Sequence, residues 1–98
     1  MTSYVLKAQD ALQEVVLDWR AGYLAPLEII VDDLGWNIRN ATFRPGDLSV
    51  SEQSHDFQKS RAVFFGGHAA RFYLLSNRVR TSRDRTLERL LVMRIASG

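Results

Sequence analysis

The segment FYLLSNRVRTSRDRTLERLLVMRI, residues 72–95, decides the fold of this chain. Side chains of a strand point alternately to the two sides of a sheet, and two runs in the segment, residues 72–81 and 87–95, are rich in residues that favour strands. The polar residues between the runs are typical of a turn. The sequence therefore predicts a β-hairpin.

The pairing of the two runs is predicted from the residues that it would bring together. A three-residue loop at residues 83–85 places Leu75 opposite Met93 and Arg80 opposite Glu88, which is a favourable cross-strand pair. A two-residue loop would instead set core residues opposite charged ones. We therefore expect the three-residue loop.

The two faces of the predicted hairpin differ from those of an ordinary water-exposed sheet. One face supplies core residues, namely Tyr73, Leu75, Val79, Leu91, Met93 and Ile95. The other face carries Phe72, Leu74, Leu90 and Val92, although a sheet that faces water is normally polar on that side. Either the N-terminal segment folds back over these four side chains, or they form a docking surface for a partner protein, and both hold if the segment covers a neighbouring subunit.

The rest of the chain has the turn signals of an all-β protein. Turns are expected at residues 32–35, 44–47 and 66–67, and a polar loop at residues 51–58. The strands expected between them are residues 13–19, 27–31, 36–43, 48–50 and 61–65. Six or seven short strands separated by such turns indicate a β-sandwich or a small barrel.

Residues 1–12 are expected to form an arm or a short helix ahead of the sandwich domain, residues 13–98. Val5, Ala8 and Leu12 recur at three- and four-residue steps, as the buried side of an amphipathic helix does. The segment lacks the pattern of a signal peptide, and no apolar run is long enough to span a membrane. We expect a soluble protein that folds in the cytoplasm.

The composition of the chain narrows the range of possible functions. The 98 residues suffice for one domain, and the absence of cysteine excludes disulfides and thiolate metal sites. Residues 1–58 hold nine acidic and four basic residues, whereas residues 59–98 hold nine basic and two acidic ones. A basic half suits nucleic acid, but it equally suits an acidic protein surface, including the N-terminal half of the same fold.

No residue pattern indicates catalysis, a metal or a cofactor. His55 and His68 stand thirteen residues apart without cysteine, which is no zinc pattern. Asp32 and Asp33 are interpreted as turn residues, and residues 66–67 lack the lysine that follows the glycines of a phosphate-binding loop. We predict that the protein is not an enzyme and has no cofactor.

Seven arginines between residues 71 and 94 are the strongest argument for nucleic acid. Alternation, however, distributes them over both faces and the tip of the hairpin instead of gathering them in one groove. Arginine is also favoured in protein interfaces, because its planar guanidinium can donate two hydrogen bonds to one carboxylate. An acidic partner protein is therefore preferred to nucleic acid.

At the hairpin the sequence resembles the phage fibre-to-tail adaptor family. The resemblance lies in Gly66-Gly67, in YLLSNRVRT at residues 73–81 and in RTLERLLVMRI at residues 85–95. Upstream, Asp18-Trp19 is also similar to that family, as are residues 38–43 followed by Pro45 and by Leu48-Ser49-Val50. The sequence departs from the family pattern in an apparent insertion at residues 25–36, in the lack of a glycine at the hairpin tip, and in apolar residues at three often polar positions, Leu87, Leu90 and Val92.

The resemblance implies an immunoglobulin-like antiparallel sandwich and a place in the tail of a phage virion. The protein would be made in the bacterial host and would link tail or baseplate components to fibres or neighbouring subunits, in several symmetric copies. The alternatives are a host-directed or nucleic-acid-binding phage module and a neck or capsid decoration protein of the same fold. The residues predicted to contact a partner are Phe72, Leu74, Arg78, Arg80, Arg83, Leu90 and Val92.

Overall fold

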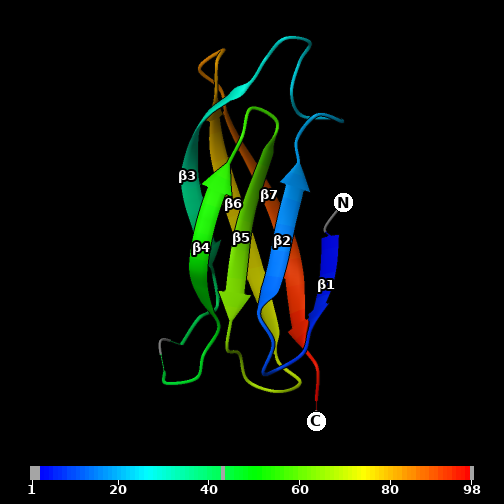
Figure 1. The fold of residues 1–98 in the computed structure, drawn as a ribbon, viewed down its shortest axis with the longest axis vertical. Coiled ribbons are helices and arrows are strands. Elements are labelled where there is room, and N and C mark those ends of the chain that lie inside the picture. Colours follow the sequence, from blue (N-terminus) through cyan, green and yellow to red (C-terminus); the bar gives the residue numbers. More distant parts are fainter. Residues whose placement is uncertain (1–2, 43, 98) are drawn as a thin grey trace.

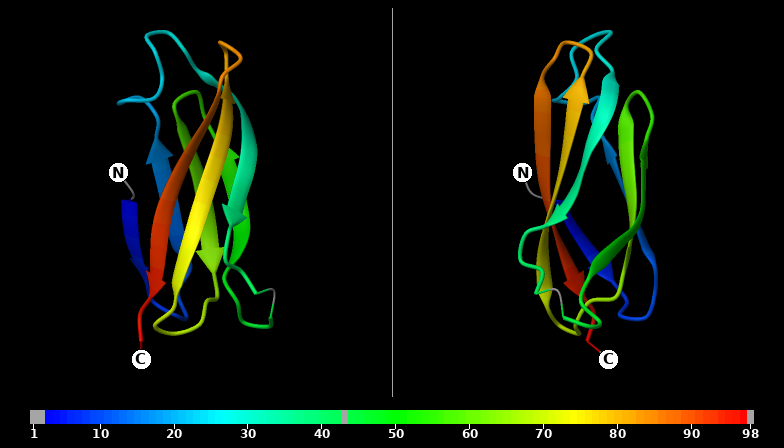
Figure 2. Two further views of the ribbon diagram at one scale, coloured as in Figure 1. Left: turned by 180° about the vertical axis from the view of Figure 1, so that it is seen from behind. Right: turned by 90° about the vertical axis from the view of Figure 1, so that its left-hand side faces the viewer.

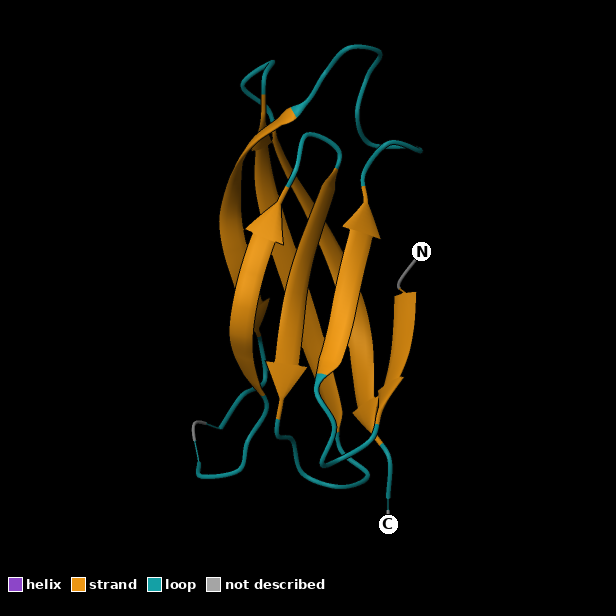
Figure 3. Ribbon diagram, in the orientation of Figure 1, coloured by secondary structure: helices purple, strands orange, loops and turns teal. Residues whose placement is uncertain are grey.

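Seven strands in two sheets make up the computed structural model, which describes residues 3–42 and 44–97 (Figure 1). No helix occurs in those two ranges (Figure 3). The strands are β1 (Ser3–Lys7), β2 (Gln13–Asp18), β3 (Ile30–Ile38), β4 (Ser49–His55), β5 (Lys59–Phe65), β6 (Phe72–Thr81) and β7 (Thr86–Ile95). The prediction of an all-β sandwich is confirmed.

The two sheets lie face to face, as the side view in Figure 2 shows. One sheet has the strand order β1-β7-β6-β3 and the other the order β2-β5-β4. Apart from β1, the strands follow the order of an immunoglobulin constant domain, in which B, E and D form one sheet and G, F and C the other. All pairs are antiparallel except β1 with β7, which is parallel.

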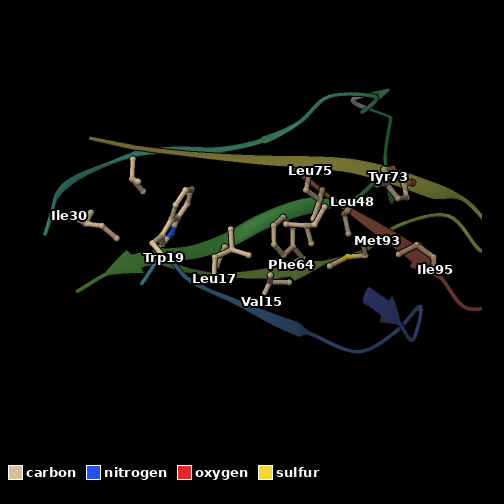
Figure 4. Packing of buried hydrophobic residues seen from close by; sticks show 13 residues of the cluster. Val15, Leu17, Trp19, Ile30, Leu48, Phe64, Tyr73, Leu75, Met93 and Ile95 are labelled. Atoms are coloured by element: carbon tan, nitrogen blue, oxygen red, sulfur yellow. The ribbon is translucent and has the colours of Figure 1, made fainter. Parts of the chain in front are cut away.

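The core lies between the sheets and contains the hairpin face that the sequence predicts. Tyr73, Leu75, Val79, Leu91, Met93 and Ile95 are each at most 1% exposed. They pack against side chains of the second sheet, among them Val15, Leu17 and Phe64 (Figure 4). A buried chain of hydrogen bonds also joins the sheets, from Trp19 Nε1 to Ser60 Oγ (2.8 Å) and from Ser60 Oγ to Asn77 Oδ1 (2.6 Å).

Of the two forms expected for residues 1–12, an arm or a short helix, the helix is wrong, because residues 3–7 form strand β1. The edge of β7 offers unpaired backbone groups, and a parallel partner strand satisfies them. Val5 packs against the core, and Lys7 is buried with its ammonium donating to the Gly66 carbonyl (2.9 Å). Burial lowers the pKa of Lys7. Residues 1–2 of the predicted arm lie outside the described residues.

The turn predicted at residues 32–35 is also wrong. The chain runs straight through it as β3, with register shifts on both sides of Asp32 and Asp33. Gly35 adopts a φ of 113°, which only glycine takes easily, and thereby accommodates the irregular pairing. Turn-forming residues here mark bulges within one strand, so the two strands predicted around them are a single strand. The second of these predicted strands was residues 36–43, and its last residue lies outside the described ranges.

Two further predictions need correction. Residues 51–58, predicted as a polar loop, mostly belong to β4, whose polarity suits an exposed edge strand. The β6–β7 register is shifted by two residues from the predicted one, so that Leu75 pairs with Leu91 and Arg78 with Glu88. The three-residue loop therefore comprises residues 82–84. Since the shift is even, every side chain keeps its predicted face.

Candidate protein-interaction surface

Six apolar side chains lie together on the outer face of the β1–β7–β6 sheet. The register places Leu6 beside Arg94 and Arg94 beside Phe72, and in the next row Tyr4 beside Val92 and Val92 beside Leu74. Leu90 follows on β7. We call this set the outer patch: Tyr4, Leu6, Phe72, Leu74, Leu90 and Val92.

The outer patch is substantially open to solvent. Tyr4 is 58% exposed, Leu6 56%, Phe72 52% and Leu90 40%, while Leu74 and Val92 are half-buried. Such side chains are common one at a time on protein surfaces, but six neighbours on one face form a continuous apolar area. Four of them were predicted as contact residues. Tyr4 and Leu6 were not among the predicted contact residues, because the short segment Ser3–Lys7 does not by itself reveal the open edge of β7 with which it pairs.

The N-terminal segment does not fold over the predicted apolar face. β1 lies beside β7 at the edge of the same sheet and adds Tyr4 and Leu6 to the apolar area (Figure 1). The first of the two explanations left open by the sequence is thus wrong. Within the described residues, the outer patch is extended and not covered.

The three predicted arginines have different surroundings. Arg78 is exposed and makes no ion pair with a carboxylate of the described residues. Arg80 is paired with Asp32 and lies 3.7 Å from Asp84. Arg83 belongs to the hairpin tip and donates to the Pro26 carbonyl (3.0 Å). Of these three arginines, Arg78 and Arg80 share a sheet face with the outer patch, and Arg83 does not.

The other sheet presents a more polar outer face. Its centre is an ionic cluster in which Arg61 lies 2.8 Å from Glu14 and 3.6 Å from Glu52. Val16, which pairs with Arg61, and Phe65, the last residue of β5, are exposed there, and the carboxylates of Glu14 and Glu52 lie in the row between them. The two outer faces of the sandwich thus differ, and the continuous apolar area belongs to one of them.

Much of the charge difference between the two halves of the sequence is neutralised inside the fold. Glu14 pairs with Arg61, Asp32 with Arg80, and Glu28 with Arg85, in each case an acid from the first half and an arginine from the second. The Arg85 guanidinium, the Ala25 N–H and the Thr81 hydroxyl together hold the pKa of Glu28 well below its usual range. The basic C-terminal half is therefore no uniform cationic surface.

A hydrogen-bonded cluster fixes the start of β6, next to the outer patch. The Tyr73 hydroxyl donates to Asp47 Oδ1 (2.5 Å) and accepts from the His68 N–H (3.0 Å). A tyrosine that bonds backward from the start of this strand is a known feature of immunoglobulin-like sandwiches. Burial alone would raise the pKa of Asp47, but hydrogen bonds from Tyr73, Thr42 and Leu48 outweigh it and lower the pKa.

The groups considered for catalysis have structural surroundings. His55 is exposed, and the backbone of His68 belongs to the tyrosine cluster. Asp33 accepts from Asn77 Nδ2 (2.9 Å) and from the Gly35 N–H (2.9 Å), so it stabilises the bulge of β3. Residues 3–42 and 44–97 contain no group of three side chains that could hold a metal ion. Nor does any helix capable of crossing a membrane occur in those ranges.

The strand order places the chain in the class of immunoglobulin-like β-sandwiches. The family model described as podophage GP4 fiber-tail adaptor protein gp77 matches residues 7–94. The chain therefore belongs to this family of phage fibre–tail adaptors, which confirms the resemblance seen at the hairpin. The family is a structural one and not a class of enzymes, and its place is the tail of the virion. No curated protein matches the chain.

Proposed function

We propose that this adaptor joins a tail or baseplate component to a tail fibre or a neighbouring subunit, and that the outer patch is the contact surface. The observation that carries the proposal is the group of six apolar side chains over β1, β7 and β6, with Arg94 between Leu6 and Phe72, whereas the opposite sheet has a more polar outer face. The protein would be made in the host cytoplasm and built into the virion in several symmetric copies.

The size of the patch supports repeated copies. Complete burial of one large apolar side chain contributes about 1.5–3 kcal/mol, so the remaining exposed halves of Tyr4, Leu6, Phe72 and Leu90 would contribute roughly 3–6 kcal/mol together. Association costs about 4–15 kcal/mol in lost freedom of motion. One patch alone gives weak binding, whereas several copies on one symmetric ring bind together through avidity.

The charges beside the patch favour an acidic partner. Arg78 lacks a carboxylate partner in the described part of the chain, and the Arg94 guanidinium lies over the Phe72 ring at 5.5 Å. Arg94 lies between Leu6 and Phe72, and Arg78 lies farther along β6 on the same face. A partner surface with an apolar centre and carboxylates at its rim would complement this arrangement.

Leu90→Asp tests the proposal. Leu90 is 40% exposed, so the variant should fold, but a charge in the apolar contact should abolish incorporation into particles. Val16→Asp is the matched control, because Val16 is 49% exposed on the outer face of the other sheet. Mass spectrometry of purified particles measures incorporation. Normal incorporation of a folded Leu90→Asp protein would refute the proposal, and salt-sensitive retention on DNA would favour the nucleic-acid alternative.

A further inference from the structure

Three connections meet at the end of the sandwich opposite the C-terminus, and hydrogen bonds join them (Figure 1). The connections are residues 19–29, residues 56–58 and the hairpin tip at residues 82–84, and together we call them the loop end. The Ile30 N–H donates to the Phe57 carbonyl (2.8 Å), and the Ser82 N–H donates to the Ile29 carbonyl (2.8 Å). The loop end is therefore built as one preorganised unit.

A buried carboxylate holds the longest of these connections in place. The Glu28 side chain is fully buried and accepts from Arg85, from the Thr81 hydroxyl and from the Ala25 N–H (2.8 Å). Arg85 also donates to the Tyr23 carbonyl (2.9 Å). The segment on both sides of residue 27 is thus bonded to the β6–β7 hairpin, although the residue itself touches little of the protein.

Leu27 is unfavourable to the isolated domain in two ways. It is 98% exposed, so almost its whole apolar side chain lies in water. Its φ is 66°, in the left-handed region where a side chain costs free energy and glycine does not. Strained, exposed residues that the surrounding structure holds rigidly are typical of binding sites.

Two other features of the loop end point to a protein partner. Phe57, in the β4–β5 connection, is 67% exposed and supplies a second large apolar side chain. Arg83 donates to the carbonyl of Pro26, the residue before Leu27, and has no carboxylate partner among the residues described. The other arginines of this end, Arg20 and Arg85, are paired within the fold.

We propose that the loop end is a second docking surface, which inserts Leu27 into an apolar pocket of a partner protein, with a carboxylate at the pocket's rim meeting Arg83. The inference rests on the proposed function, because a protein that links two components needs two separate contacts. The outer patch serves one component and the loop end the other. Phe72 at the start of β6 and Leu27 lie toward opposite ends of a molecule 45 Å long, so both partners fit at once.

The variant Leu27→Gly separates a binding role from a structural one. Glycine adopts the observed φ without strain, so the thermal midpoint of the variant should equal or exceed that of the wild type. Its affinity for one partner should fall at least about tenfold, as expected when a central contact residue is lost. Leu12→Gly is the control, because Leu12 is also strongly exposed, at 68%, but lies at the other end of the sandwich.

The full chain is tested against purified tail and fibre components of the same phage in a surface-binding assay. Leu27→Gly should lose one component and keep the other, Leu90→Asp should show the reverse, and Leu12→Gly should bind both. If wild-type protein binds both components and Leu27→Gly is unchanged, or loses the same component as Leu90→Asp, the two-surface inference is wrong and the adaptor function stands. If wild-type protein binds neither component, both are wrong. An effect of Leu27→Gly on self-association alone would make the occupant a second copy and would overturn the partner proposed here.

Discussion

Replacing Tyr73 with phenylalanine removes one oxygen atom from the interior and nothing else. The hydroxyl makes two hydrogen bonds, donating to Asp47 and accepting from the His68 N–H. Tyr73 is fully buried and Asp47 is 6% exposed, so water does not readily replace the lost partner. The ring itself keeps its packing in the core.

The expected loss of stability follows from these two bonds. A hydrogen bond to a charged group is worth about 1.5–3 kcal/mol, and one between neutral groups about 0.5–1.5 kcal/mol. Asp47 retains its bonds from Thr42 and from the Leu48 N–H, which limits the cost. We expect Tyr73→Phe to lower the free energy of unfolding by about 2–4 kcal/mol and the thermal midpoint by roughly 10–20 °C.

Urea denaturation followed by the fluorescence of the buried Trp19 measures this loss, and Tyr4→Phe is the control because Tyr4 is 58% exposed. The pH dependence gives a second reading. Because the pKa of Asp47 is lowered in the fold, its stabilising effect is present above the ordinary value of 3.8 and is lost as the pH falls below it. The difference between wild type and Tyr73→Phe should therefore shrink below that pH. A difference under about 0.5 kcal/mol at neutral pH, or one that persists unchanged in acid, would refute the reasoning.

Two further predictions concern the stability of the fold. Gly66→Ala should destabilise the domain by more than about 2 kcal/mol in urea denaturation, because its Cβ would lie 2.6 Å from the Asp47 carbonyl oxygen. Gly22→Ala is the control: Gly22 has a similar φ but open space around it, so this variant should lose only about 1 kcal/mol. Equal losses would contradict the reasoning. Glu28→Gln should flatten the fall in stability on acidification, since Arg85 and its other partners lower the pKa of Glu28 and its contribution is lost as the pH falls below the ordinary value of 4.5. The test is to measure the urea midpoint of both proteins at a series of pH values. If the midpoint of Glu28→Gln falls on acidification as steeply as that of the wild type, Glu28 does not have this role.

The strong alternation of the C-terminal hairpin made most of the sandwich predictable. A period of two over β6 and β7 assigns each side chain to a face, and an error of two residues in register leaves that assignment intact. This explains why the core face of Tyr73 to Ile95 was correct although the loop was misplaced by one residue. Phe72, Leu74, Leu90 and Val92 were assigned to the opposite face for the same reason.

The elements that were not predicted depend on contacts far away in the sequence. β1 forms because β7 offers an open edge, and a window of a few residues around Val5 contains no sign of that edge. Likewise, Asp32, Asp33 and Gly35 are turn residues by local preference, but pairing with β6 keeps them in one bulged strand. Tertiary pairing overrode local preference in both cases.

The candidate contact surface was predicted only where it lies on regular strands. The exposure of Leu27 and its positive φ arise from a clamp between Glu28 and Arg85, which are 57 residues apart. No local pattern marks such a residue, because a leucine after a proline normally suggests the start of a strand or an ordinary turn. Only the folded arrangement separates it from the core leucines.

The two proposed surfaces also explain why the fold places its two buried carboxylates, Asp47 and Glu28, at its two ends. At one end Tyr73 and Asp47 fix the start of β6, beside Phe72 and Leu74. At the other, Glu28 fixes the long connection that carries Leu27. Buried charged groups add little net stability compared with apolar packing, but they do specify one geometry. A protein that is to bind two components at once needs defined geometry at both contacts more than it needs a larger core, and rigid ends reduce the entropy lost on binding.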